Sequence, residues 1–345
     1  MSADNIFEGL SKFGLSPYEI KVLSTLLIEG EQTSTQVVRA SGVPQPRIYD
    51  IFDSLKRKGF IEVSPGKKKI YRAVPLSVSS KRQIDELRDL STKIDDFVEL
   101  HKSRNRVPTP FVWLVEDDRQ IASRIRKMID SASTEVIFSA NSDTFDLAFK
   151  HLKKAIARGV TVALVTFPDT PVQKLLELNG SVSRIRSSPA SEVLIVDRNS
   201  ALLNVGDDVS DRKYALYFDD SELIHISNYY FFHTIWVPSK QVTAFDLTKP
   251  VLLSTTWLAC EAIDQIKKEG SNIYAVMKCI MDKREQTLSG IITGTKRILG
   301  MRHTFFIKVS DKIYSVGGRT ARLEDARMIE LRLNTKRTNI TAKSY

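Results

Sequence analysis

Residues 15–75 read LSPYEIKVLSTLLIEGEQTSTQVVRASGVPQPRIYDIFDSLKRKGFIEVSPGKKKIYRAVP, and this stretch decides the fold of the first part of the chain. Apolar residues recur every three or four positions in three segments, and a glycine follows each segment, which predicts three helices. Ser16 is the expected N-cap of the first helix, Pro17 occupies its first turn and Glu19 completes a capping box.

The pattern changes after Gly59. Residues 60–63 and 69–74 are typical of two short strands, and the Ser-Pro-Gly-Lys sequence at 64–67 is a turn signal, so a β-hairpin is predicted. Because only a few residues separate the second and third helices, the order of elements predicts a winged helix-turn-helix.

The third predicted helix opens within residues 43–50, and Pro44 and Pro46 fit a first turn, where no backbone N–H donor is needed. The N-terminal residues of this helix meet base edges in the major groove of DNA. Gln pairs with adenine and Arg with guanine, so Gln45 and Arg47 are expected to read bases. The full set of predicted DNA contacts is Ser34, Gln45, Arg47, Tyr49, Lys56, Lys67, Lys68, Lys69 and Arg72.

Charge supports a nucleic-acid interface. Residues 44–72 contain eight basic and three acidic residues, and the lysines at 67–69 are expected to contact phosphate or the minor groove. Two alternatives stay open: residues 56–58 could be a solvated helix end favoured by the helix dipole, and Tyr49 could belong to the core of the motif.

Residues 79–103 contain no Gly or Pro and predict one long helix. Its seam, at alternating steps of three and four, consists of Ile84, Leu87, Ser91, Ile94, Val98 and His101. Leu90, Phe97 and Leu100 widen the apolar stripe. The stripe favours a coiled coil that joins two chains into a homodimer; the alternative is a helix that packs on its own domain.

Beyond a linker at 104–110, strand-like and helix-like segments alternate, which predicts an α/β layer. The expected strands are residues 111–115, 135–140, 160–167, 192–197 and 214–220, and the expected helices are residues 119–132, 145–158, 223–236 and 257–269. After residue 302 the chain alternates again, with a turn at residues 310–311 and a Gly-Gly corner at 317–318, so β-hairpins are predicted.

Composition is that of a globular protein of two or three domains: 345 residues, 42% of them hydrophobic. Lys and Arg outnumber Asp and Glu by 51 to 41, a net charge of +10 that is compatible with a polyanionic partner. The two cysteines, Cys260 and Cys279, make neither a disulfide framework nor a zinc site. Without a signal peptide or an apolar span, the chain is expected in the cytoplasm, associated with the nucleoid.

Four stretches near the N-terminus carry a resemblance to a known family. They are LSPYE at 15–19, SGVP at 41–44, RIYD at 47–50 and residues 55–60. They resemble the DNA-binding domain of the TrmB family of archaeal sugar-responsive transcription regulators. Residues 303–305, 316–318 and 323–325 are similar, more weakly, to the sugar-binding domain of that family.

The resemblance implies a multidomain α+β fold in its long form. The expected parts are a winged helix-turn-helix at 1–76, a coiled-coil dimerisation helix at 77–105, a non-catalytic phospholipase-D-like α/β domain at 106–248 and a small β-rich effector-binding domain at 249–345.

The resemblance also implies sugar contacts. The family uses the second glycine of the corner, the residue after it, a short segment ending in Glu, and an Asn fifteen residues earlier, where this chain has His303. The family also has a serine contact in the middle domain, for which Ser227 is the candidate in this chain. The implied effector contacts are Ser227, His303, Gly318, Arg319, Arg322, Leu323 and Glu324. A glycine lets a ligand approach the backbone and a carboxylate accepts two hydroxyl groups; the alternative is a plain hairpin corner and a surface charge.

The C-terminal charge departs from the family pattern. Residues 290–345 contain twelve basic and four acidic residues, and Arg319 and Arg322 stand where the family tolerates small or apolar residues. Because Arg suits phosphate and carboxylate, we hypothesise an anionic effector, such as a sugar phosphate or a sugar acid. A pocket that binds nothing is the alternative.

An enzyme is not expected. Phospholipase-D chemistry uses His-x-Lys with an Asp five residues after the Lys; His151 and Lys153 begin the pattern, but Arg158 stands at the Asp position. Walker A, HExxH and CxxC motifs are missing, and no metal or other cofactor is predicted.

The sequence therefore predicts a homodimeric transcriptional regulator, a repressor or an activator, that binds a double-stranded DNA operator and a sugar or sugar-phosphate effector. The alternative function is an architectural, chromatin-like double-stranded DNA-binding protein without an effector response.

Overall fold

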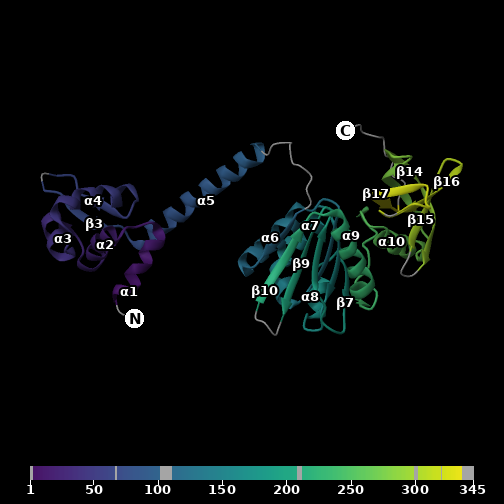
Figure 1. Ribbon diagram of the computed structural model, residues 1–345, viewed down its shortest axis with the longest axis horizontal. Helices are drawn as coiled ribbons and strands as arrows, with labels where there is room; N and C mark the ends of the chain where they lie inside the picture. Colours follow the sequence, from purple (N-terminus) through teal and green to yellow (C-terminus); the bar gives the residue numbers. More distant parts are fainter. Residues whose placement is uncertain are drawn as a thin grey trace. The chain divides into compact units, whose positions relative to one another are not determined.

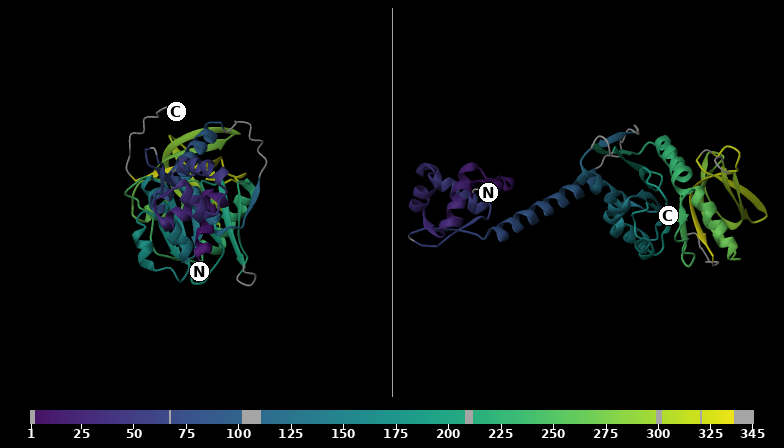
Figure 2. Two further views of the ribbon diagram at one scale, coloured as in Figure 1. Left: turned by 90° about the vertical axis from the view of Figure 1, so that its left-hand side faces the viewer. Right: turned by 90° about the horizontal axis from the view of Figure 1, so that it is seen from below.

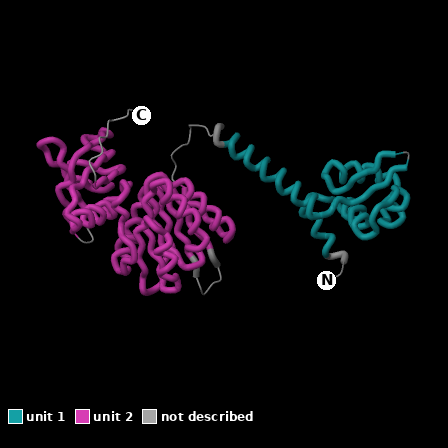
Figure 3. Tube along the Cα trace, turned by 180° about the vertical axis from the view of Figure 1, so that it is seen from behind, with its two compact units in different colours: residues 1–107 teal, residues 108–345 magenta. Residues whose placement is uncertain are grey.

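The computed structural model describes residues 3–66, 68–101, 111–207, 212–298, 302–319 and 321–335. The chain divides into two compact units, residues 1–107 and residues 108–345 (Figure 3). Across the described ranges, no helix is both long and apolar enough to cross a bilayer.

Unit 1 contains the three predicted helices and the hairpin. Its elements are α1 (Ala3–Glu8), the 3-10 turn η1 (Gly9–Phe13), α2 (Pro17–Glu29), β1 (Gln32–Thr33), α3 (Ser34–Ser41), the 3-10 turn η2 (Gln45–Arg47), α4 (Ile48–Arg57), β2 (Ile61–Val63), β3 (Ile70–Ala73) and α5 (Leu76–His101) (Figure 1). The three strands form an antiparallel sheet in the order β1-β3-β2. α3 and α4 therefore form the helix-turn-helix, with α4 as its recognition helix, and the two-stranded wing of β2 and β3 follows α4.

One predicted boundary in unit 1 is wrong. The third helix begins at Ile48, and residues 45–47 form a separate 3-10 turn. Pro46 has no N–H to donate and its ring restricts the residue before it, so regular α-helical hydrogen bonding starts only beyond the proline. Gln45 and Arg47 consequently sit in the turn that enters the helix.

The core of unit 1 connects α4 to the wing. Val22, Leu23 and Leu55 are fully buried among the helices. The ring of Phe52 stacks on that of Tyr71 in β3, with 3.6 Å between centroids. This packing fixes the position of the wing relative to the recognition helix.

The predicted capping box of α2 is present, and its Glu19 also forms a partly buried ion pair with Lys58. The Ser16 amide donates to Glu19 Oε2 at 2.6 Å, and Lys58 Nζ lies 2.8 Å from Glu19 Oε1. Burial by itself would raise the pKa of Glu19, but the hydrogen bonds from Lys58, Ser16 and Ser54 lower it to about 2. Lys58 is therefore a structural residue, and the basic run at the end of α4 is not uniformly solvated.

Replacing Glu19 by Gln is expected to lower the free energy of unfolding of unit 1 by about 2 kcal/mol at pH 7, because Lys58 loses its buried partner. The pKa of Glu19 is depressed, so the carboxylate stabilises the fold above about pH 4.5, and this contribution disappears as the pH falls through about 2. Calorimetry of the variant should accordingly differ least from the parent at acidic pH. Glu8→Gln, at an exposed carboxylate, is the control; an equal loss there would contradict the assignment.

α5 is a single 26-residue helix (Figure 2), and its apolar stripe is largely exposed. The exposed fractions are 44% for Ile84, 64% for Leu87, 53% for Leu90, 52% for Ile94, 60% for Phe97 and 48% for Val98. Only its first turns pack on the winged helix, where Ser79 is buried and Gln83 donates to the Lys58 carbonyl oxygen. Residues 102–105 of the predicted dimerisation helix and the linker to residue 110 lie outside the described residues.

Unit 2 begins with an eight-stranded mixed sheet. Its elements are β4 (Val112–Val115), α6 (Asp118–Ser131), β5 (Glu135–Ala140), α7 (Ser142–Ala157), β6 (Thr161–Thr166), α8 (Val172–Glu177), β7 (Val182–Ile185), β8 (Glu192–Val196), β9 (Ser200–Asp207), β10 (Arg212–Phe218), α9 (Ser221–Tyr230), the π-helical turn η3 (Phe231–Trp236) and β11 (Lys240–Gln241). The strand order is β11-β7-β6-β5-β8-β9-β10-β4, and only β5, β6 and β7 run parallel. The predicted α/β layer is confirmed, although β7, β9 and β11 were not predicted.

The remaining strands of unit 2 close into a small barrel. They are β12 (Val251–Leu253), β13 (Tyr274–Met281), β14 (Arg284–Ile298), β15 (Arg302–Val309), β16 (Lys312–Gly317) and β17 (Ala326–Asn334), with α10 (Thr256–Lys268) after β12. The order is β12-β17-β13-β14-β15-β16, and β16 also pairs with β17, so the sheet returns on itself. The predicted hairpin turn at Ser310 is present, whereas β13 and β14 were not predicted.

The two faces of the middle sheet have different covers. α6, α7 and α8 pack on one face, and α9, η3 and α10 belong to the core on the other face, together with the inner side of the barrel (Figure 1). The middle domain and the barrel therefore share one continuous hydrophobic core.

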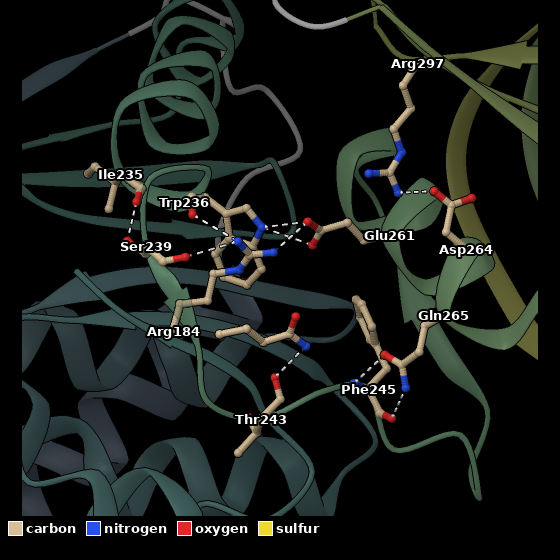
Figure 4. Close-up of polar contacts among 11 residues, drawn as sticks. Arg184, Ile235, Trp236, Ser239, Thr243, Phe245, Glu261, Asp264, Gln265 and Arg297 are labelled. Atoms are coloured by element: carbon tan, nitrogen blue, oxygen red, sulfur yellow. Dashed lines mark hydrogen bonds and ion pairs between the residues drawn. The ribbon is translucent and has the colours of Figure 1, made fainter. Parts of the chain in front are cut away.

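Polar contacts join α10 to the middle domain (Figure 4). Arg184 of β7 lies 2.8 Å from Glu261 of α10, and its guanidinium stacks over the Trp236 ring at 4.4 Å. The Trp236 indole N–H donates to the same carboxylate, and Gln265 exchanges two hydrogen bonds with the Phe245 backbone. These contacts hold the second and third turns of α10 against β7, η3 and the segment at Phe245.

Candidate nucleic-acid interface and effector cavity

The base-reading residues predicted in unit 1 are exposed at the start of the recognition helix. Gln45 and Arg47 lie in the turn before α4, and Arg47 lies over the Tyr18 ring at 5.6 Å. Tyr49 is 56% exposed and its Oη is 3.5 Å from Ser34 Oγ at the start of α3. Tyr49 thus does not belong to the core, and the two helix starts form one polar surface.

The predicted phosphate contacts differ in whether another residue of the chain already pairs with their side chains. Lys56, Lys68 and Lys69 are exposed, and Lys67 lies outside the described residues. Arg72 is held on the wing by Glu62 at 2.6 Å and reaches Glu31 at 3.6 Å. Arg72 must therefore exchange carboxylate partners for phosphate if it contacts DNA.

Unit 2 contains a cavity of about 840 Å³ between the middle domain and the barrel. One wall is a single helical face: Ser221, Ile224, His225, Asn228, Tyr229, Phe232 and His233. The opposite residues come from the start of α10, the first residues of β15, the corner after β16 and β17. The volume is in the range of small-molecule sites.

Stacked aromatic rings from both sides line one part of the cavity. Trp257 stacks on His303 with 3.7 Å between centroids and on Phe232 with 5.0 Å, and the His233 ring meets it edge-on. Burial, followed by the charge of Arg297, lowers the pKa of His303 to about 4. His303 is therefore neutral at pH 7 and able both to donate and to accept a hydrogen bond.

Two buried polar atoms in the wall lack partners among the described residues. They are Asn228 Oδ1 and His233 Nε2. Buried polar groups without partners cost free energy, and a bound polar ligand relieves that cost. The aromatic wall and these two atoms suit a ligand rich in hydroxyl groups.

Glu324 is already engaged. Its Oε1 accepts hydrogen bonds from Arg302 Nε at 2.5 Å and from Thr304 Oγ1 at 2.9 Å. Burial acts to raise the pKa of Glu324, but these two bonds hold it below its usual value. Glu324 is thus ionised, and its ion pair with Arg302 holds the corner in place.

Comparison with known proteins identifies the family. Three family models match this chain: "Sugar-specific transcriptional regulator TrmB" over residues 10–77, the N-terminal subdomain of the TrmB effector-binding domain over 111–243, and the C-terminal subdomain of TrmB/TrmBL1 over 248–336. The chain belongs to the TrmB family of transcriptional regulators. Its DNA-binding and cavity-forming parts both fall within the matched residues.

Individual relatives of this TrmB-family chain include the sugar-sensing transcriptional regulator TrmBL1 of Pyrococcus furiosus, 27% identical over 340 residues, which cover 94% of this chain and 97% of that protein. TrmBL2 of the same organism is 28% identical over 48% of this chain and 68% of its own length. Among solved structures, TrmBL2, described as an archaeal chromatin protein, matches 70% of this chain and all of its own with a TM-score of 0.40 at 21% identity. Nuc of Salmonella typhimurium, a phospholipase D family member, matches 39% of this chain and 98% of its own with a TM-score of 0.32 at 21% identity.

The structure brings most of the implied effector residues of this TrmB-family chain together. The cavity is lined by His303, Gly318, Arg319, Arg322, Leu323 and Glu324. Ser227 does not line it: its side chain is buried and its hydroxyl donates to the Leu223 carbonyl oxygen. Ser227 lies off the helical face that carries Asn228, which takes its place in the wall.

The glycine corner also has a packing role. A Cβ on Gly317 would lie 2.7 Å from Glu324 Cδ, and one on Gly318 would lie 3.0 Å from Thr256 Oγ1. The corner therefore requires glycine for close packing inside the protein, in addition to any approach of a ligand.

Sequence reasoning missed several wall residues. Arg198, Asn228, His233 and Trp257 line the cavity, and none was predicted. For α9 a signal existed, because the spacing of its apolar and polar residues defines a face. For Arg198, in the turn between β8 and β9, the sequence gives no indication, since only the fold brings that turn to the cavity.

Proposed function

We propose that this chain binds a DNA operator as a homodimer and that a sugar or sugar-derived effector in the cavity of unit 2 controls that binding. The observation that carries the proposal is the cavity, because it gathers six effector residues implied by sequence together with unpartnered polar atoms. The TrmBL1 relative is a sugar-sensing regulator, which supports an effector of this class.

Dimerisation is proposed through α5. Its apolar stripe is exposed in unit 1, and a second copy of the same helix would cover it. Because an effector acts only through a difference in affinity between two arrangements, we propose that it changes the spacing of the two winged helices.

We also propose that the middle domain catalyses no phosphodiester chemistry. His151 Nδ1 is 2.8 Å from Asp130, and Lys153 lies over the Phe149 ring, both on the helical side of the sheet. Arg158, which stands where the catalytic motif has Asp, donates to two backbone carbonyl oxygens. The partial motif is thus part of a helix surface.

Footprinting of promoter fragments tests the regulator. We expect protection of one pseudo-palindromic site, and a change of at least about 5-fold in operator affinity with one member of a sugar series. General coverage of the duplex would favour an architectural protein, and an unchanged affinity throughout the series would remove the sensing role.

The wing lysines are expected to supply salt-dependent affinity. The double variant Lys68→Ala/Lys69→Ala should reduce the slope of log K against log salt by about 1.8 for each bound chain, because each phosphate contact contributes roughly 0.9. Lys12→Ala/Lys21→Ala, with the same charge change away from the wing, should leave the slope unchanged. A steep slope that persists in the wing variant would contradict the assignment.

A further inference from the structure

Arginines gather at one end of the cavity. The lining contains Arg198, Arg302, Arg319, Arg322 and Arg327, against the carboxylates of Asp197 and Glu324. Burial is the main reason that the pKa of Arg198 is lowered; Glu135 opposes the shift, and Arg319 and Arg327 add to it. All three of Arg198, Arg319 and Arg327 line the cavity, and Arg319 follows shortly after Gly317, which pairs with Arg327 between β16 and β17; these three residues are called here the arginine end.

The carboxylates near the arginine end are committed elsewhere. Both oxygens of Asp197 accept hydrogen bonds from the backbone amides of residues 133–135, and Glu324 is held by Arg302. Buried Glu135 accepts from Ser254 and Thr255. Among the described residues, none of these carboxylates forms an ion pair with Arg198, Arg319 or Arg327.

The arginines themselves are only partly compensated. Arg319 is paired with Glu222, which is itself exposed, and Arg198 donates to the Ser254 carbonyl oxygen. Within the described ranges, the exposed guanidinium groups of Arg322 and Arg327 make no hydrogen bond or ion pair. Clustered guanidinium groups at a partly buried site favour a bound anion, and their planar forks suit phosphate or carboxylate oxygens.

The other end of the cavity is lined by uncharged side chains that can form hydrogen bonds. Asn228 and His233 carry the unpartnered polar atoms, and they follow His225 along the same face of α9 and η3. Arg319 donates to the Ser221 carbonyl oxygen at the start of α9, and burial, followed by the charges of Arg319 and Arg198, lowers the pKa of His225 in the same helix. The cavity thus has a cationic end near the start of α9 and an uncharged, hydrogen-bonding end farther along.

We propose that the effector is a sugar that carries an anionic group, a phosphate or a carboxylate, bound between Arg198, Arg319 and Arg327, with its hydroxyl groups on Asn228 and His233. This inference rests on the proposed effector site and specifies its ligand class. A neutral sugar would leave the arginine end only partly compensated, by the ion pair of Arg319 with Glu222.

Calorimetry on the full chain tests the ligand class with glucose, maltose, glucose 1-phosphate, glucose 6-phosphate, gluconate and inorganic phosphate. We expect at least one phosphorylated or acidic sugar to bind about tenfold or more tightly than its neutral parent and than inorganic phosphate. Comparison of the sugar phosphates with gluconate shows whether the site prefers a phosphate or a carboxylate group.

A charge-removing variant with a matched control locates the anion. Arg327→Met should reduce the affinity for the anionic sugar about tenfold or more and leave the affinity for neutral sugars unchanged. Arg332→Met, at an exposed arginine of the same strand that does not line the cavity, should change neither. Thermal unfolding of both variants without ligand checks that they fold.

The contrary outcomes are distinct. Tight binding of a neutral sugar with no gain from a charged group overturns the inference and leaves the proposed regulator intact. Equal binding of inorganic phosphate and sugar phosphate overturns the sugar part of the site. If no sugar of either kind binds while the operator is still protected, both this inference and the sensing role are wrong, and the DNA-binding role remains.

Discussion

The double variant Gln45→Ala/Arg47→Ala is expected to weaken operator binding by about 100-fold or more, since each bidentate contact to a base contributes roughly 1–3 kcal/mol. Both side chains are exposed in the turn before α4, so their removal leaves the core of unit 1 intact. Fluorescence anisotropy at one fixed salt concentration, with operator and with unrelated duplex, measures the effect.

Comparison of the operator with an unrelated duplex distinguishes contacts to bases from contacts to phosphates. Unrelated duplex should lose little affinity, because the wing lysines still meet its phosphates. Lys21→Ala, an exposed cation on α2, is the control and should bind the operator normally. An equal loss on both duplexes would mean that Arg47 acts as a phosphate contact and that other residues choose the site.

The double variant Leu87→Glu/Ile94→Glu is expected to convert the proposed homodimer into monomers and to lower operator affinity by about 100-fold or more, because the two half-sites are then bound independently. These side chains are 64% and 52% exposed in unit 1, so no core position is disturbed. Opposed glutamates across the seam of a coiled coil would repel. Sedimentation equilibrium reports the mass, and a gel shift reports the affinity.

The outer face of α5 supplies the control for this experiment. Asp89 and Asp96 lie opposite the seam, and Asp89→Ala/Asp96→Ala should remain dimeric with unchanged operator affinity. If Leu87→Glu/Ile94→Glu is still a dimer, the chains associate through another surface and α5 serves only as a spacer.

The winged helix could be predicted because its determinants are local. The capping box of Ser16 and Glu19, the glycines that end the helices and the alternating wing each act over a few residues. Even so, the boundary at Ile48 was missed, since the effect of Pro46 on helix entry depends on the turn that forms before it. The role of Lys58 was missed as well, because its partner Glu19 is distant in sequence.

Less of the effector site than of the winged helix could be predicted from the sequence. Resemblance located the corner around Gly318 and Glu324, and the structure places those residues in the cavity wall. Ser227 was inferred from the resemblance alone, and its side chain is buried, with its hydroxyl donating to the Leu223 carbonyl oxygen. The strands β13 and β14 were not predicted, so the closure of the barrel could not be foreseen either.

By itself, the sequence determined the winged helix, the apolar stripe of α5 and the alternation of the middle domain, because caps, turns and periodicity act between near neighbours. Only the tertiary structure decided which side chains share the cavity. Arg198, Asn228, Trp257 and Arg327 come from four separate elements, and packing of α9, α10 and the barrel on one core brings them together. Proximity of that kind depends on long-range contacts, which no local pattern encodes.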